Sequence, residues 1–300
     1  MSVFKDYAEF FIFQALKSLF FFFPRELCLV FGRISGFIIY YLDRRHRQIA
    51  FANLKIAFAS HLAISDRKKI ARNSFIHLGQ TLADILKIFH LGDKQREKLI
   101  TAEGEENLQK VLQEGKGALL FTAHYGNWEM ASFFVSKLGK LWVTARPLDN
   151  KLLEKELVKL RMSLGARIIY KKQATKQILQ CLRRGEIVAL LIDQNVLRSQ
   201  AIFVDFFGKL AATTPSLASF FLRTKSPIIP VFCYPSQDRV YHLKIFEPLK
   251  ITLEGNFEHD VLKITQICTK IIESEIRQNP NFWLWFHNRW KSRPEKERQD

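Results

Sequence analysis

A histidine that ends an apolar run is the side chain in this sequence best placed for chemistry. In the segment GALLFTAHYGNWE, His124 follows an expected strand over residues 118–123, and Glu129 lies in the first turn of an expected helix over 128–138. The intervening Gly-Asn pair permits a tight turn. A carboxylate in that turn can hold the imidazole Nδ1 and leave Nε2 free to take a proton. The spacing therefore predicts a general base, His124, oriented by Glu129; the simpler alternative is a capping Glu beside an ordinary, partly buried His.

The spacing alone is weak, because two other His–acid pairs in the chain share it. His242 and Glu247 lie in a segment that alternates like a strand, where an offset of five residues sends the two side chains to opposite faces. His61 and Asp66 lie in a polar stretch in which a Ser-Asp pair supplies the expected N-cap of the next helix. Only the context of His124 favours catalysis.

Composition and charge narrow the setting. The chain has 300 residues, enough for one large α/β domain or two small ones, and 48% of them are hydrophobic. The formal net charge of +17 favours an anionic partner, with a solvated basic surface as the alternative. The four cysteines have neither close pairing nor metal spacing, so they are expected to be reduced core thiols.

The N-terminal part of the chain predicts membrane association. Two apolar runs, over residues 10–23 and 27–42, are each shorter than the roughly 20 residues that a span requires. They could span with a tilt or lie in the interface, and a pair of buried core helices is the alternative. The basic cluster 43–47 follows where arginines would meet anionic headgroups. The expected organisation is a membrane-associated segment over 1–42 and a catalytic domain over 43–300.

Apolar runs and helical periods alternate through the remainder of the chain. Residues 48–98 read as helical, with a helix around 70–89. The following expected elements are strands at 118–123, 141–145, 167–169, 187–192, 227–234 and 240–246, and helices at 128–138, 152–164, 176–184 and 260–277. This order predicts an α/β fold with a central, mostly parallel sheet flanked by helices.

Several ordered sequence blocks resemble the bacterial lipid A biosynthesis late acyltransferases. The blocks are His124-Tyr-Gly-Asn-Trp-Glu129, Ala145-Arg-Pro-Leu-Asp-Asn150, Asp193-Gln-Asn195, Phe203-Val-Asp-Phe-Phe-Gly208 with Ala212-Thr-Thr-Pro215, and Trp285-Phe-His-Asn-Arg-Trp-Lys-Ser-Arg-Pro294. Their order and spacing run through almost the whole chain. The resemblance implies a glycerolipid-acyltransferase-like fold and an enzyme of the cell inner membrane, at its cytoplasmic face. It also implies transfer of a fatty acyl chain from acyl carrier protein to a hydroxyl of a lipid A precursor.

The resemblance also assigns site residues. The family's His-x4-acid dyad falls on His124 and Glu129 as catalytic residues. The expected substrate-binding residues are Asn127, Arg146, Arg161 and Asp193. For the two arginines the alternative is ion pairing at a helix end or on the surface, and for the aspartate it is a strand-end cap. Where relatives often continue Asp-Gln-Asp, this chain has Asn195, which casts doubt on any acid role at that position.

The expected reaction is direct acyl transfer. His124 would deprotonate the acceptor hydroxyl, and amides near Gly126 or Asn127, or an arginine, would stabilise the oxyanion. No Ser or Cys lies beside His124 in a nucleophile motif, so an acyl-enzyme is not expected, and the reaction needs no metal or cofactor. Expected partners are acyl carrier protein, the lipid A precursor and an anionic membrane, but no nucleic acid.

Two other interpretations remain open at this point. A related acyltransferase could modify another glycolipid or an aminolipid, and a non-enzymatic module could bind an anionic membrane or nucleic acid. In the C-terminal block, the basic candidates for acidic partners are Arg289, Lys291 and Arg293. Three tryptophans in this part of the chain could settle at a membrane interface or pack on the sheet; they are Trp283, Trp285 and Trp290.

Overall fold

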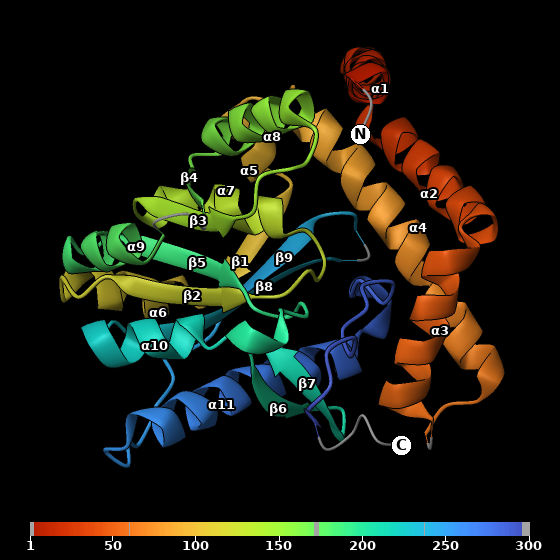
Figure 1. Cartoon of the computed structure of the whole chain (residues 1–300). Helices are drawn as coiled ribbons and strands as arrows, with labels where there is room; N and C mark the ends of the chain where they lie inside the picture. Colours follow the sequence, from red (N-terminus) through yellow and green to blue (C-terminus); the bar gives the residue numbers. More distant parts are fainter. Residues whose placement is uncertain (1–2, 60, 171–173, 237, 296–300) are drawn as a thin grey trace.

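The computed structural model describes residues 3–59, 61–170, 174–236 and 238–295, and in this part the core is a seven-stranded sheet (Figure 1). The strand order is β1-β9-β8-β2-β5-β3-β4. Every neighbouring pair is parallel except β8 and β9. The strand bounds are β1 (Ile100–Glu103), β2 (Ala118–Thr122), β3 (Leu141–Ala145), β4 (Arg167–Tyr170), β5 (Ile187–Leu191), β8 (Ile228–Pro235) and β9 (Tyr241–Ile245). The predicted α/β fold with a mostly parallel sheet is confirmed.

Both faces of the sheet are buried, which explains the continuous apolar strands. Along β2, Leu119 and Phe121 face one core cluster, whereas Leu120 faces the other. The second cluster includes α7 (Trp128–Leu138) and α8 (Lys151–Ser163). The first includes α9 (Ala174–Arg183), α10 (Ser216–Thr224) and α11 (Phe257–Gln278). Figure 1 shows α7 and α8 on one side of the sheet and α10 and α11 on the other.

Four N-terminal helices stand beyond the carboxyl ends of the central strands (Figure 1). They are α1 (Val3–Phe22), α2 (Arg25–Leu42), α3 (Arg44–Phe58) and α4 (Ile64–Ile88). Because α4 begins at Ile64, the expected Ser-Asp N-cap lies inside the helix, and that expectation is wrong. The remaining elements are α5 (Asp93–Glu97), α6 (Glu105–Gln113), an antiparallel hairpin of β6 (Ile202–Phe206) and β7 (Lys209–Thr213), and two short 3₁₀ turns.

Helices α2 and α4 cross at very close range. A Cβ atom on Gly79 would lie 2.2 Å from the carbonyl oxygen of Gly32, and one on Gly36 would lie 2.4 Å from the carbonyl oxygen of Phe75. At the start of α2, Arg25 donates to both carboxylate oxygens of the buried Asp84 at 2.7 Å. The N-terminal helices are therefore packed into the body of the protein by backbone contact and by a buried ion pair.

Helices α1 and α2 also carry a large exposed apolar surface. Its members on α1 include Phe4, Tyr7, Phe11, Ile12, Leu19, Phe21 and Phe22, and those on α2 include Leu27, Val30, Phe31, Ile34, Phe37, Ile38, Ile39, Tyr41 and Leu42. Among the residues that the structure describes, no helix combines the length and the apolar character needed to cross a membrane.

Candidate active site

His124 and Asp193 lie side by side because two neighbouring parallel strands place them there. Thr122 of β2 is level with Leu191 of β5, so the residues two positions beyond each are level as well. The His124 Nδ1 lies 2.8 Å from Asp193 Oδ1, and the His124 backbone N–H donates to Asp193 Oδ2 at 3.0 Å. An ionised carboxylate can only accept hydrogen bonds, so Nδ1 carries the proton and Nε2 presents its lone pair.

The expected hydrogen bond between Glu129 and His124 is not what the structure shows. Glu129 lies in the first turn of α7, but its carboxylate accepts from Arg161 of α8, at 2.7 Å from one terminal nitrogen and 3.1 and 3.2 Å from Nε. The guanidinium fork satisfies the buried carboxylate with several charge-assisted bonds, a stronger arrangement than one imidazole N–H. The carboxylate that contacts His124 is Asp193, so the contact inferred from the His-x4-acid spacing does not form, and a catalytic role of Glu129 stays a prediction.

Asp193 is held in its charged form although it is buried. Burial opposes its ionisation, but the charge of His124 and the hydrogen bonds from His124 and Trp283 lower the pKa of Asp193 to about 2. The Trp283 indole Nε1–H donates to Asp193 Oδ2 at 2.8 Å. The site therefore keeps a carboxylate ready to stabilise an imidazolium at neutral pH.

The reactive nitrogen of His124 faces two further side chains. The side-chain amide of Gln194 lies 3.3 Å from His124 Nε2 and donates to its lone pair in this tautomer. The ring of Trp128 meets the imidazole edge-on, with 5.1 Å between ring centroids. With 22% of its side chain exposed, His124 is accessible to a substrate hydroxyl. The arrangement can therefore act as a general base.

The loop after His124 has its backbone amides engaged. The Gly126 N–H donates to the Phe282 carbonyl at 3.0 Å, and the Asn127 N–H donates to the Cys233 carbonyl at 2.8 Å. Gly126 adopts φ +63°, and a Cβ atom there would lie 1.9 Å from the Cys233 oxygen, so glycine is required. Amides near these two residues, or an arginine, were the expected oxyanion donors. In this structure the N–H groups of Gly126 and Asn127 already donate to backbone carbonyls.

The remaining predicted substrate-binding residues differ in their surroundings. Asn127 is buried, and its side-chain oxygen accepts from the Met130 N–H at 3.1 Å, so it caps α7. Arg146 lies on the loop after β3 with 77% of its side chain exposed, and it pairs with Asp149 at 3.3 Å. Arg161 lies at the site because it is paired with Glu129 and lines the same pocket. The structure thus brings Arg161 and Asp193 to the site and leaves Arg146 at the surface.

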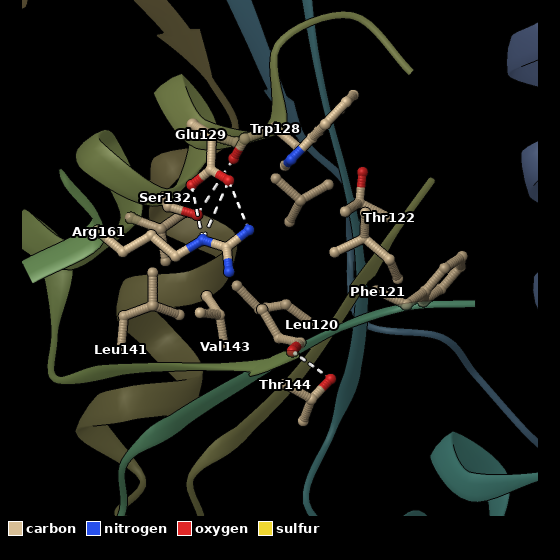
Figure 2. A pocket seen from close by; sticks show the side chains of 15 residues that line it. Leu120, Phe121, Thr122, Trp128, Glu129, Ser132, Leu141, Val143, Thr144 and Arg161 are labelled. Atoms are coloured by element: carbon tan, nitrogen blue, oxygen red, sulfur yellow. Dashed lines mark hydrogen bonds and ion pairs between the residues drawn. The ribbon is translucent and has the colours of Figure 1, made fainter. Parts of the chain in front are cut away.

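An apolar pocket, here called the α7 pocket, lies between α7 and the sheet. Its lining residues are Leu120, Phe121, Thr122, Trp128, Glu129, Ala131, Ser132, Val135, Leu141, Val143, Thr144, Arg161, Ala189, Leu191 and Val231. Its empty space, including the part open to solvent, is about 540 Å³. Figure 2 shows Arg161 paired with Glu129 on one side, with Leu141, Val143 and Leu120 close by.

The C-terminal block lies against the site. Trp285 and Trp290 of this block and Trp283 just before it are all buried, so the packing interpretation is the right one and the membrane-interface interpretation is wrong. Arg289 is also buried and donates to the Ala212 carbonyl at 2.6 Å, which removes it from the surface candidates for an acidic partner. Asn195 Oδ1 accepts from the Ser292 N–H at 3.0 Å, so this position holds the C-terminal segment.

The contacts of Trp283 and Gln194 with the site were missed from the sequence. Gln194 lies in a quoted block and Trp283 lies two residues before another, yet an indole donor in an aromatic run looks like ordinary core. The only available signal for Gln194 was its place directly after Asp193 at a strand end. Neither contact can be inferred without the order of the strands.

Several known acyltransferases are similar to this chain. The family model for bacterial lipid A biosynthesis acyltransferases matches residues 3–292. The chain is 28% identical over 269 residues to a lipid A biosynthesis palmitoleoyltransferase of Escherichia coli, covering 89% of this chain and 86% of that protein. It is 24% identical to a lipid A biosynthesis acyltransferase of Haemophilus influenzae, over 83% and 77% of the two chains. A phosphatidylinositol mannoside acyltransferase of Mycobacterium tuberculosis is 25% identical over 62% of this chain and 58% of its own.

The match of one family model from residue 3 to residue 292 takes in His124, Asp193 and the two strands that precede them, the α7 pocket and most of the C-terminal block. This protein is an acyltransferase, and it belongs to the bacterial lipid A biosynthesis acyltransferase family.

Proposed function

We propose that this protein transfers a fatty acyl chain from acyl carrier protein to a hydroxyl of a lipid A precursor, at the cytoplasmic face of the inner membrane. The observation that carries the proposal is the bond between His124 Nδ1 and Asp193, which leaves Nε2 accessible near an apolar pocket. The lipid A enzymes among the relatives support the acceptor, and the basic composition suits an acidic donor protein and a phosphorylated acceptor.

In the proposed reaction, His124 Nε2 removes the proton of the acceptor hydroxyl as its oxygen attacks the thioester carbonyl. The tetrahedral intermediate collapses by breaking the carbon–sulfur bond, and the imidazolium returns its proton to the leaving thiolate. Before the proton transfer, Asp193 fixes the tautomer of the neutral imidazole. While the proton is on His124, Asp193 stabilises the imidazolium. A positioned base of this kind contributes typically 10²–10⁴-fold to the rate.

The α7 pocket is the proposed place for the acyl chain. Trp128, at one end of its α7 wall, touches the imidazole, and Val135 lies about 10 Å farther along the helix axis. Aliphatic side chains form most of the pocket lining as a whole. The Glu129–Arg161 pair joins α7 to α8 across this wall, so its proposed role is to shape the pocket.

Helices α1 and α2 are the proposed membrane contact. Their exposed apolar side chains would lie in the interface, and the exposed Arg44 and Arg45, directly after α2, would meet anionic headgroups. The division into a membrane-associated segment over 1–42 and a catalytic domain over 43–300 is part of this proposal.

The membrane contact can be measured by flotation with lipid vesicles. Phe11→Asp and Ile34→Asp change exposed residues of α1 and α2, and together they are expected to weaken binding to vesicles that contain anionic lipid. Leu262→Asp, at an exposed apolar position of α11, is the matched control and should bind like the unaltered protein. Equal binding by all three proteins would contradict the membrane assignment.

The acceptor is tested with purified protein and acyl-loaded acyl carrier protein. Acylation of a lipid A precursor, detected by mass spectrometry and lost in His124→Ala, is the expected result. The mycobacterial relative favours a second candidate acceptor, a phosphatidylinositol mannoside, which should be offered in parallel. If only that glycolipid is acylated, the proposed acceptor is wrong and the proposed acyl transfer stands. Full activity of His124→Ala would contradict the mechanism.

A further inference from the structure

Trp283 lies directly behind the acid that orients the base. We propose that Trp283 is a positioning residue for acyl transfer. Its indole N–H fixes Oδ2 of Asp193, so that Oδ1 keeps His124 in the tautomer that can act as a base, with the proton on Nδ1. This inference rests on the proposed function and adds a third member to the hydrogen-bonded unit that performs it.

The two oxygens of Asp193 are divided among three donors. Oδ1 faces His124 Nδ1 at 2.8 Å, while Oδ2 accepts from the His124 backbone N–H at 3.0 Å and from Trp283 Nε1–H at 2.8 Å. Only 2% of the Asp193 side chain is exposed, so solvent cannot easily replace a lost donor. Without the indole, the backbone amide alone would hold Oδ2, and rotation of the carboxylate would be less restricted.

The backbone places the indole independently of its hydrogen bond. The Leu284 N–H donates to the His124 carbonyl at 3.3 Å, and Tyr125 forms an isolated antiparallel bridge with Trp283. The Trp283 ring also packs edge-on against Trp285, with 4.7 Å between centroids, and against Phe206 at 5.7 Å. Residues 124–125 and the segment that carries Trp283 are therefore joined, and the indole is held at a fixed position relative to Asp193.

Trp285 and Trp290, in the C-terminal block that follows Trp283, provide matched controls. Trp285 Nε1–H donates to the Pro280 carbonyl at 2.6 Å, and Trp290 Nε1–H donates to the Lys209 carbonyl at 3.4 Å. All three rings are buried, so replacing each by phenylalanine removes a buried indole donor and some ring volume. Only at Trp283 does the donor reach the carboxylate of the site.

The first test compares three phenylalanine variants in the acyl-transfer assay. Trp283→Phe is expected to lower kcat by roughly tenfold or more, because a hydrogen bond to a charged group is lost, with KM for donor and acceptor within about twofold. Trp285→Phe and Trp290→Phe are expected to keep kcat within about threefold, at a temperature at which circular dichroism shows all variants folded. Equal losses in the three variants would overturn the proposal.

A double-mutant cycle separates positioning from packing. In an Asp193→Asn background the charged acceptor is gone, so adding Trp283→Phe should lower kcat by no more than about twofold. A packing defect would lower kcat by the same factor in both backgrounds, and that result would overturn the proposal.

A spectroscopic test does not depend on turnover. The indole N–H resonance of Trp283, assigned by its loss in Trp283→Phe, should shift in Asp193→Asn, whereas those of Trp285 and Trp290 should stay in place. An unmoved Trp283 resonance would show that the hydrogen bond is absent. If the shift occurs but the unaltered protein acylates none of the acceptors offered, then the proposed function fails and the contact with Asp193 stands.

Discussion

Glu129 and Asp193 are both buried carboxylates near the loop that follows His124, but they have different partners. Asp193 meets the imidazole of His124, and Glu129 meets the guanidinium of Arg161. Their contributions to acyl transfer should therefore be separable in kinetics, since Asp193 contacts His124 and Glu129 lies in the wall of the α7 pocket.

Replacing each carboxylate by its amide tests this division. Asp193→Asn is expected to lower kcat by roughly 10²–10⁴-fold, because the amide neither fixes the tautomer nor stabilises the imidazolium. Glu129→Gln should mainly raise KM for the acyl donor, because Arg161 loses its partner inside an apolar pocket. Steady-state kinetics with varied donor decide the matter, and the reverse pattern would restore Glu129 as the acid that orients His124.

His77 gives the protein a defined sensitivity to acid. Burial lowers the pKa of His77 from its usual 6.5 to about 4, while a hydrogen bond to the Gly126 carbonyl works the other way. The unfolded chain takes up a proton below about 6.5 and the folded protein does not. Folding stability should therefore fall as the pH drops from 6.5 toward 4, by up to about 1.4 kcal/mol per pH unit from this residue.

His77→Gln keeps an amide donor for the Gly126 carbonyl and removes the titration. Its free energy of unfolding in urea should fall less between pH 7 and pH 5 than that of the unaltered protein, by about 1–2 kcal/mol. Parallel pH profiles for the two proteins would mean that His77 does not titrate in this range.

At the residue scale, the sequence identified the members of the site better than their partners. His124, Arg161 and Asp193 were all expected there. The chain distance of five between His124 and Glu129 suggested a contact that does not form, whereas 69 positions separate His124 from Asp193, the residue it does contact. That contact depends on β2 and β5 being neighbours, and strand order is a long-range property that spacing does not encode.

Helix α7 and the sheet under it form the element that should set acyl-chain length. Ala131 and Val135 lie one turn apart on the pocket wall, at increasing distance from Trp128. Ala131→Leu is expected to favour shorter donors, and Val135→Ala is expected to accept longer ones, because one fills and the other enlarges the pocket. Competition between donors of different length, read by mass spectrometry, measures both, and an unchanged preference in the pair would place the acyl chain elsewhere.

Elements with a strong local pattern were predicted well. The expected helix over 128–138 and the expected strand over 141–145 coincide with α7 and β3. The hairpin of β6 and β7 and the edge strand β1 were not recognised as strands. The contacts that stabilise them come from distant parts of the chain, since β1 pairs with β9 and β6 packs against α11.

In the whole molecule, the first two helices are joined to the body by the close crossing of α2 and α4. A methyl group on Gly79 would collide with the backbone of Gly32 and force the two helices apart. Gly79→Ala is therefore expected to destabilise the protein by about 1–3 kcal/mol, as overpacking does. Thermal unfolding measures the effect, and Gly92→Ala, where a Cβ would have its nearest neighbour at 4.0 Å, is the control. Equal melting temperatures would show that the crossing can relax.

The same crossing explains why the N-terminal part could not be read unambiguously from the sequence. Its apolar residues fall into two groups, since Phe20 and Cys28 are buried against Ala83 of α4 while many others are exposed. Composition alone does not distinguish the buried group from the exposed one. Whether residues 1–42 form a separable membrane segment stays a prediction, and the Arg25–Asp84 pair indicates what its removal would expose: a buried aspartate without its cation.

The chain leaves the centre of the sheet after α7 and returns at β5, and everything between forms an excursion toward the edge strand β4. His124 and Asp193 follow the two strands that bracket this excursion, whereas Arg161 and the β3 part of the pocket wall belong to the excursion itself. Under the proposed function, donor preference and proton transfer are therefore expected to change independently of each other. A chimera that receives residues 128–186, which include α7 as well as the excursion, from a relative with another acyl preference is expected to inherit that preference and to keep its turnover.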